Sequence, residues 1–325
     1  MEYKVSVIIP VYNRAYIVAR ALDSVLRQTL QDIEVIVVDD GSTDNSVEVV
    51  KGYQNNCSNI KLFTIPHSGP GAARDVGIKN AHGTYVVFLD SDDFIPERAY
   101  ELMFQKAEEE QCDFVIGQIV RKIDTVQNGE WFIPEKISRV IRSYLGANCV
   151  EGYDIALINP SLCNRMIRRS TILENNLLFG AEMFAEDYIY NINLFRCSKY
   201  AAVIDEVVYC YETNYLEMSS SITAATLELI LSGLKSLSKS VLFFDSIGRV
   251  DWEINSLLGP FEFVLQRFKK LPFHDKEIAF EKIKEYLKHY QNRREYEIPI
   301  RHLMGMDLDV LLLLPYSAYE ICQSL

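Results

Sequence analysis

The chain has 325 residues, 49% of them hydrophobic and 24% charged, an ordinary globular composition with enough length for roughly two or three domains. Its net charge of −12 argues against general nucleic-acid binding, and its seven scattered cysteines argue against a disulfide framework or a zinc site. No apolar run approaches the roughly 20 residues of a membrane span and the first residues do not resemble a signal peptide, so we expect a cytoplasmic protein.

The first half of the chain alternates apolar, strand-like runs with segments of helical spacing. Strands are expected at 5–10, 33–38, 60–65, 85–89 and 113–116, and helices at 16–26, from 44, at 71–81 and at 96–110. This alternation predicts right-handed βαβ units and an α/β fold with a mainly parallel sheet. The run 85–89 is apolar throughout, as expected for a strand that is buried on both faces.

The second half is mixed and then helical. Strands are expected at 162–168 and 201–211, with a helix at 187–195 between them. After Thr223 the apolar residues follow the i, i+3, i+4 rule. We therefore predict an α/β domain over 1–220, with halves 1–118 and 119–220, and a helical accessory domain over 221–325.

Unusual polar residues follow four of the predicted strands. They are, in chain order, Pro10, Tyr12, Asn13, Arg14, Asp39, Asp40, His67, Ser68, Gly69, Gly71, Arg74, Asp90 and Asp92. Ligands of parallel sheets bind beyond the carboxyl ends of the strands. We therefore expect these four loops to form one site.

Three carboxylates, Asp90, Asp92 and Asp93, follow the strand at 85–89 directly. Acids in such a place repel one another and lose solvation, so a positive partner is expected. Mn²⁺ or Mg²⁺ is the natural candidate. The alternative is that Asp92 or Asp93 caps a helix beginning near Pro96, which leaves Asp90 unexplained.

The other loop residues suit a nucleotide, although neither a GxGxxG nor a P-loop motif is present. Tyr12 is suited to stack on a base, Asp40 to accept the imide N–H of uracil, and Arg74 to meet phosphate or orient the acids. Each has a structural alternative: Tyr12 as a packed loop aromatic, Asp40 as a turn cap and Arg74 as an ion-pair partner.

The runs at 5–13, 37–44, 73–74 and 90–93 resemble the motifs of glycosyltransferase family 2, and Glu186-Asp187 falls where that family has an acidic pair. The resemblance covers Lys4 to Thr223. It implies a GT-A fold, with a Rossmann-like, mainly parallel sheet flanked by helices, a nucleoside-diphosphate sugar donor and inversion at the anomeric carbon.

The resemblance also implies roles for single residues. Asp187 matches the catalytic base, Asp92 the principal metal ligand, and Asp90 the acid near the ribose and the metal. The nucleotide-sugar site is expected to comprise Pro10, Tyr12, Asp40, Gly71, Arg74, Asp90 and Ser91. Glu186, Arg165 and His67 are expected either to contact the acceptor or to contact and position the residues that bind the ligands. His67 and Asp75 both stand where the family often has Asn.

The resulting hypothesis is metal-dependent, inverting transfer of a sugar from a UDP-sugar to a hydroxyl of a glycan or lipid-linked glycan, in bacterial cell-surface polysaccharide synthesis. The QxxRW motif of processive synthases is absent, so we expect a non-processive enzyme. Asp187 would take the proton from the acceptor hydroxyl. Two alternatives remain: a non-catalytic nucleotide-sugar-binding or assembly subunit, and a Glu186-Asp187 pair that only interacts with a helix dipole.

The stretch from Arg267 to His302 is basic within an acidic protein, with ten Lys and Arg against six Asp and Glu. It predicts either solvated helical faces or a surface for an anionic acceptor or lipid headgroup, the latter with peripheral contact at the membrane. The apolar C-terminal helices need a partner surface, and we expect a homo-oligomer.

Overall fold

The structure is a computed structural model that describes residues 3–124, 131–133, 135–145, 150–151, 162–180, 186–214, 226–247, 261, 264–291, 304 and 311–312. The chain forms two compact units. The first comprises Met1–Ala181 and Tyr190–Met218, and the second comprises Glu182–Ile189 and Ser219–Leu325.

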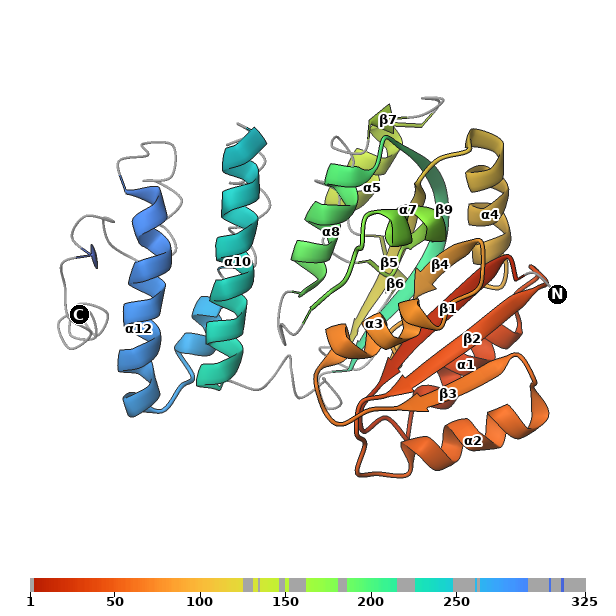
Figure 1. Cartoon of the computed structure of the whole chain (residues 1–325), viewed down its shortest axis with the longest axis horizontal. Helices are drawn as coiled ribbons and strands as arrows, with labels where there is room; N and C mark the ends of the chain where they lie inside the picture. Colours follow the sequence, from red (N-terminus) through yellow and green to blue (C-terminus); the bar gives the residue numbers. More distant parts are fainter. Residues whose placement is uncertain are drawn as a thin grey trace. The chain divides into compact units, whose positions relative to one another are not determined.

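The first unit is built on one sheet, whose described strands follow the order β3-β2-β1-β4-β8-β5-β9-β7, with β6 on β5 (Figure 1). The strands are β1 (Val5–Val11), β2 (Ile33–Asp39), β3 (Ile60–Thr64), β4 (Tyr85–Phe88), β5 (Phe114–Asp124), β6 (Trp131–Phe132), β7 (Val150–Glu151), β8 (Arg165–Arg168) and β9 (Tyr200–Asn214). The strands β1 to β4 are parallel, β8 is antiparallel to β4 and β5, and β5 runs parallel to β9. The predicted α/β class and the mainly parallel sheet are confirmed.

Helices cover both faces of this sheet. They are α1 (Val18–Leu26), α2 (Ser46–Asn56), α3 (Pro70–Lys79), α4 (Ala99–Glu110), α5 (Glu135–Ser143), α7 (Arg169–Glu174) and α8 (Glu186–Cys197). Val7 of β1 belongs to a core that includes residues of α1 and α4, whereas its neighbour Ile8 belongs to a second core with residues of α3 and α8. The approach of α3 is close, because a Cβ at Gly77 would lie 2.3 Å from Ile8 Cγ2. Side chains that alternate between two buried faces explain the continuous apolar run of each central strand.

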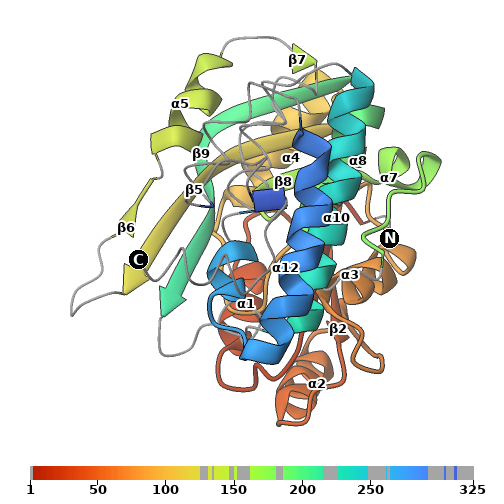
Figure 2. The ribbon, with the colours of Figure 1, turned by 90° about the vertical axis from the view of Figure 1, so that its left-hand side faces the viewer.

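Several predicted elements differ from the structure in their bounds. The helix expected from Pro96 begins at Ala99, since Pro96 to Ala99 form a turn in which the Ala99 N–H bonds the Pro96 carbonyl at 3.0 Å. The strand expected at 113–116 extends to Asp124, because its second half pairs with β9 and β6 (Figure 2). The strand expected at 162–168 is confined to Arg165–Arg168. The short elements β6, β7, α5 and α7 were not predicted.

The second unit is helical where it is described, with α10 (Leu227–Ile247), α12 (Phe273–Leu287) and a 3₁₀ turn η1 (Lys288–Tyr290). Phe280, Ile283 and Leu287 are buried, but Ile278, which was expected on the same apolar face, is 42% exposed. Lys269 and Lys270 are exposed. Arg293, Arg294 and nearly all of the apolar run at 308–314 lie outside the described residues.

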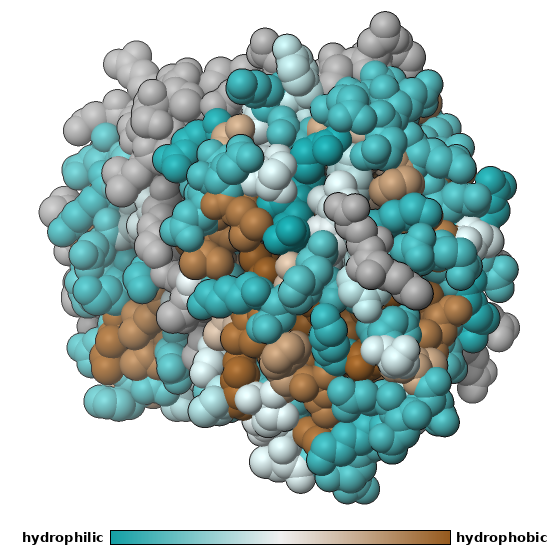
Figure 3. Space-filling view, turned by 45° about the vertical axis from the view of Figure 1, so that its right-hand side comes forward, coloured by the Kyte–Doolittle hydropathy of each residue, from teal (hydrophilic) through white to brown (hydrophobic). Residues whose placement is uncertain are grey.

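The surface of the molecule is mainly hydrophilic on the face drawn in Figure 3, with several hydrophobic patches among the polar side chains. Among the described residues, no helix is long and apolar enough to cross a membrane.

Candidate functional site

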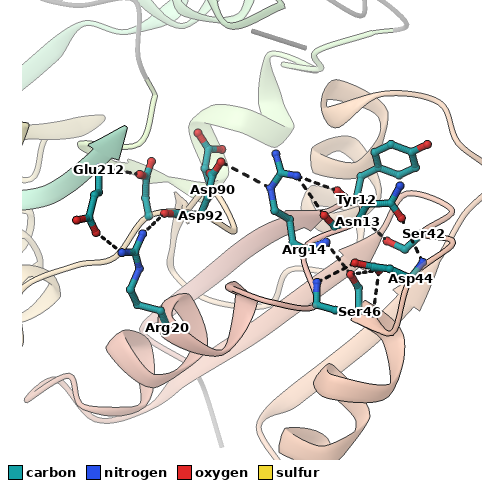
Figure 4. A network of polar contacts seen from close by, with 12 residues as sticks. Tyr12, Asn13, Arg14, Arg20, Ser42, Asp44, Ser46, Asp90, Asp92 and Glu212 are labelled. Atoms are coloured by element: carbon teal, nitrogen blue, oxygen red, sulfur yellow. Dashed lines mark hydrogen bonds and ion pairs between the residues drawn. The ribbon is translucent and has the colours of Figure 1, made fainter. Parts of the chain in front are cut away.

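The loops after β1 and β2 are tied together by hydrogen bonds. Asn13, in the left-handed region with φ 52°, accepts the Thr43 N–H on its Oδ1 at 2.8 Å and donates its own N–H to Ser42 Oγ at 2.9 Å. The Arg14 N–H bonds Ser46 Oγ at 2.8 Å (Figure 4). These hydrogen bonds between the two loops therefore fix the position of the Arg14 backbone.

Asp90 and Asp92 follow β4, and each is paired with an arginine from another loop. Arg74 Nη2 lies 2.8 Å from Asp90 Oδ1, and Arg14 Nε lies 3.6 Å from Asp92 Oδ2. The side chains of Asp90 and Asp92 are 33% and 35% exposed, so solvent and ligands reach both carboxylates. Partial burial and the charge of Asp90 raise the pKa of Asp92, while Arg14 opposes that rise.

The third acid, Asp93, faces inward and is 1% exposed. Tyr209 of β9 donates its hydroxyl to Asp93 Oδ2, and the Glu212 N–H reaches Asp93 Oδ1 at 3.3 Å. Burial, reinforced by Asp92 and Asp90, raises the pKa of Asp93 well above its usual value. Since α4 begins only at Ala99, the helix-cap interpretation of Asp92 and Asp93 is wrong, and Asp93 instead joins the acidic turn to β9.

Arg20 of α1 also contacts the acidic turn, and the sequence analysis did not identify it as a site residue. It donates to the backbone carbonyl of Asp92 and to the carboxylate of Glu212 (Figure 4). Lys122 Nζ also bonds Glu212, at 2.7 Å. Arg20, Asp92 and Glu212 are far apart in the sequence, so no local motif could have identified this contact.

Asp40 is 2% exposed and is surrounded by the loop that follows β3. Its carboxylate accepts the N–H groups of Ser68 at 2.7 Å and Gly69 at 2.9 Å, and lies 2.8 Å from His67 Nδ1. The His67 ring stacks on Tyr12, with ring centroids 4.1 Å apart and planes inclined by 19°. His67 thus contacts both Tyr12 and Asp40, and all three are predicted site residues.

Other predicted residues take less open positions. Pro10, Gly71 and Ser91 are buried beside the loops just described. Arg165 is fully buried with its guanidinium 5.6 Å from the ring centre of Phe195, which suits a supporting role and not acceptor contact. Asp75, the other departure from the family, accepts the N–H groups of Phe179 and Gly180 at 2.8 and 3.1 Å.

Glu186 and Asp187 open α8, and their turn of the helix belongs to the second unit. Glu186 is 7% exposed and Asp187 is half-buried. Two acids in a first helical turn interact favourably with the helix dipole whatever else they do.

The donor set at the acidic turn suits a hard divalent cation. Asp90 and Asp92 supply carboxylate oxygens that are partly exposed at the end of a buried strand. In the part of the chain that the structure describes, no group of three His, Cys, Asp or Glu side chains is placed to hold a metal ion. Such a cation would therefore be held by one or two carboxylates and completed by ligand oxygens, which is the usual coordination of Mg²⁺ beside phosphates.

The sequence matches that of a known family over this region. The family model described as Glycosyl transferase family 2 covers residues 6–174, just over half of the chain. EpsJ of Bacillus subtilis, an uncharacterized glycosyltransferase, is 31% identical over 65% of this chain and 61% of its own length. The cholesterol galactosyltransferase of Borreliella burgdorferi is 29% identical over 68% of this chain and 63% of its own length.

A third relative, the poly(ribitol-phosphate) beta-glucosyltransferase of Bacillus spizizenii, is 30% identical over 64% of this chain and 32% of its own length. The chain thus spans less than two thirds of each of these relatives. The crystal structure of S. aureus TarS 1-349 in complex with UDP-GlcNAc has a TM-score of 0.71 at 21% identity, covering 95% of this chain and 89% of that one. This likeness shows that the fold is GT-A, as predicted.

Proposed function

Because the chain belongs to glycosyltransferase family 2, we propose that it transfers a sugar from a UDP-sugar to a hydroxyl of a glycan or lipid-linked glycan in bacterial cell-surface polysaccharide synthesis. The reaction is metal-dependent, non-processive and inverting. The observation that carries this proposal is the pair Asp90 and Asp92, each held by an arginine and each partly exposed, at the carboxyl end of β4.

The donor nucleotide would occupy the loops after β1, β2 and β3. Tyr12 offers an aromatic face for the base, and Asp40 a carboxylate for an imide N–H, which uracil has and cytosine lacks at that position. TarS, which shares the fold, has been crystallised with UDP and with UDP-GlcNAc, which supports a uridine nucleotide for this chain as well. Arg74 is placed to orient the Asp90 carboxylate.

Asp92 and Asp90 would hold Mn²⁺ or Mg²⁺, which when bound offsets the charge that develops on the departing diphosphate. Asp187 would take the proton from the acceptor hydroxyl as that oxygen attacks the anomeric carbon. Attack from the side opposite the leaving group forms the new C–O bond as the bond to the diphosphate breaks, which inverts the configuration. Glu186 precedes Asp187 in the same first turn of α8.

The acceptor class rests on the relatives. One is a poly(ribitol-phosphate) beta-glucosyltransferase and another a cholesterol galactosyltransferase, so the acceptors named for these relatives at about 30% identity are a poly(ribitol-phosphate) and cholesterol. The exposed Lys269 and Lys270 would suit an anionic acceptor or the surface of a membrane. Cytoplasmic action and self-association through the C-terminal helices complete the proposal.

The test is a screen of UDP-sugars for UDP release, with and without EDTA and with no acceptor added. We expect slow hydrolysis of one donor that depends on Mn²⁺ or Mg²⁺. A folded protein that binds UDP but hydrolyses no donor and transfers to no acceptor extract would favour the alternative, a nucleotide-sugar-binding or assembly subunit.

A further inference from the structure

The His67 side chain makes both of the contacts that the proposed base would make. Its ring stacks on Tyr12 with centroids 4.1 Å apart and nearly parallel planes, as a base on a tyrosine would. Its Nδ1 lies 2.8 Å from Asp40 Oδ2 and 3.1 Å from the Asp40 carbonyl oxygen. Both neighbours of Nδ1 are oxygen acceptors, so Nδ1 carries the hydrogen and donates it.

Uracil in the proposed subsite would make the same two contacts: it would lie on Tyr12 and donate an N–H to Asp40. The ring and the base would use the same face of Tyr12 and the same carboxylate oxygen. They therefore exclude one another, and a nucleotide that stacks on that face has to displace the imidazole first.

The displacement needs no opening of the loop. The carboxylate of Asp40 is also held by the N–H groups of Ser68 and Gly69, which remain when the His67 ring leaves. The backbone at His67 is packed closely against Gly41, where an added Cβ would lie 2.8 Å from the His67 nitrogen. The side chain of His67 is 44% exposed, so rotation about its own bonds carries the ring into solvent.

We propose that His67 is an internal ligand of the base subsite, which competes with the donor nucleotide and so sets its affinity. This inference rests on the proposed function. The competition costs every base the same free energy, because each must break the same two contacts before it binds. The selection of uracil over cytosine then comes from Asp40, which regains a donor at ring N3 from uracil but meets an acceptor there in cytosine.

The test is calorimetric titration of UDP, CDP and pyrophosphate into wild type, His67→Ala and His67→Phe, all with Mn²⁺ present. Removing the ring should tighten UDP and CDP by a common factor of about 5- to 100-fold, the range expected for one aromatic contact and one hydrogen bond. Pyrophosphate, which has no base, should bind all three proteins equally. His67→Phe keeps a ring for Tyr12 but has no N–H, so its UDP affinity should lie between those of wild type and His67→Ala.

His82→Ala is the matched control, because its ring is 66% exposed and it lies before β4, at the opposite edge of the sheet. Unchanged or weaker UDP binding in His67→Ala would overturn the inference while leaving the proposed function intact. An equal gain for pyrophosphate would overturn it too. If wild type and the two His67 variants are all folded and none of them binds UDP, the proposed function is wrong. The inference, which rests on it, is then wrong as well.

Discussion

Arg74 of α3 donates from Nη2 to Asp90 Oδ1 at 2.8 Å, which joins the loop after β3 to the acidic turn after β4. The arginine side chain is 5% exposed, and its guanidinium also lies 5.3 Å from the ring centre of Phe179. Of the three readings of Arg74, this contact agrees with orientation of the acids and also with a plain ion-pair partner. A planar guanidinium held in this way fixes the direction of the Asp90 carboxylate.

Replacing Arg74 by lysine should weaken Mn²⁺-dependent UDP binding by about 5- to 100-fold, the usual range for one charged hydrogen bond. Lysine keeps the positive charge but not the planar fork, so the protein should stay folded. Arg98→Lys is the control, because Arg98 is exposed and its one ion pair among the described residues is with Glu101 of α4. Unchanged UDP affinity in Arg74→Lys would show that Asp90 needs no such support.

Asp187→Asn should keep donor binding and lose turnover. The amide preserves the shape of the side chain but cannot take a proton, so kcat should fall by about 100-fold or more while the affinity for UDP stays the same. Single-turnover transfer at saturating acceptor, followed by UDP release, measures the loss.

Glu228→Gln separates this role from a purely helical one, because Glu228 also lies in the first turn of its helix. If Asp187 only interacts with the helix dipole, Asp187→Asn and Glu228→Gln should each change the free energy of unfolding by a few tenths of a kcal/mol. Neither substitution should then affect kcat. Near-normal transfer by Asp187→Asn would remove it as the base.

Glu34 of β2 gives a prediction about pH at the amino end of the sheet, away from the site. Its side chain is fully buried, and despite that burial its pKa is lowered by hydrogen bonds from the Ser6 hydroxyl, Lys61 and the His82 N–H. A lowered pKa in the folded state contributes stability that is present above the unfolded value of 4.5 and is lost as the pH falls through the folded value. Glu34→Gln should therefore reduce the free energy of unfolding by about 1–3 kcal/mol at pH 7.

The difference between Glu34→Gln and wild type should shrink as denaturant titrations move below pH 4.5. UDP binding at pH 7 should be unchanged, because Glu34 is five residues before Asp39, or about 16 Å along the strand, from the end that holds the site. A stability difference that stays constant from pH 7 to pH 3 would contradict the assigned pKa shift.

Most strands of the sheet and the acidic turn after β4 could be predicted from the sequence. The strands β1, β2 and β4 are buried on both faces, β3 is mainly apolar, and helices separate the four, so their apolar runs located them to within a residue. The three acids after β4 were visible because charge directly after such a strand needs an explanation. The helix start near Pro96 was wrong because a turn precedes it, and a proline fits both.

The partners of the site residues could not be predicted in the same way. Arg20, Tyr209 and Glu212 reach the acidic turn from α1 and β9, and only the folded chain brings them there. His67 was noted as a departure from the family, but its contact with both Tyr12 and Asp40 depends on the path of the loop around Asp40. Residues that meet only through tertiary contacts have no characteristic spacing in the sequence, so a sequence pattern cannot identify them.

The central claim is that Asp92 binds a divalent cation which the donor nucleotide requires. Calorimetric titration of UDP into wild type and Asp92→Asn, each with Mn²⁺ and with EDTA, tests it most directly, with Glu97→Gln as an exposed acid from the same segment for comparison. The account predicts that Mn²⁺ strengthens UDP binding to wild type and Glu97→Gln, and has no effect on a folded Asp92→Asn. Equal affinity and an equal response to Mn²⁺ in all three proteins would contradict it.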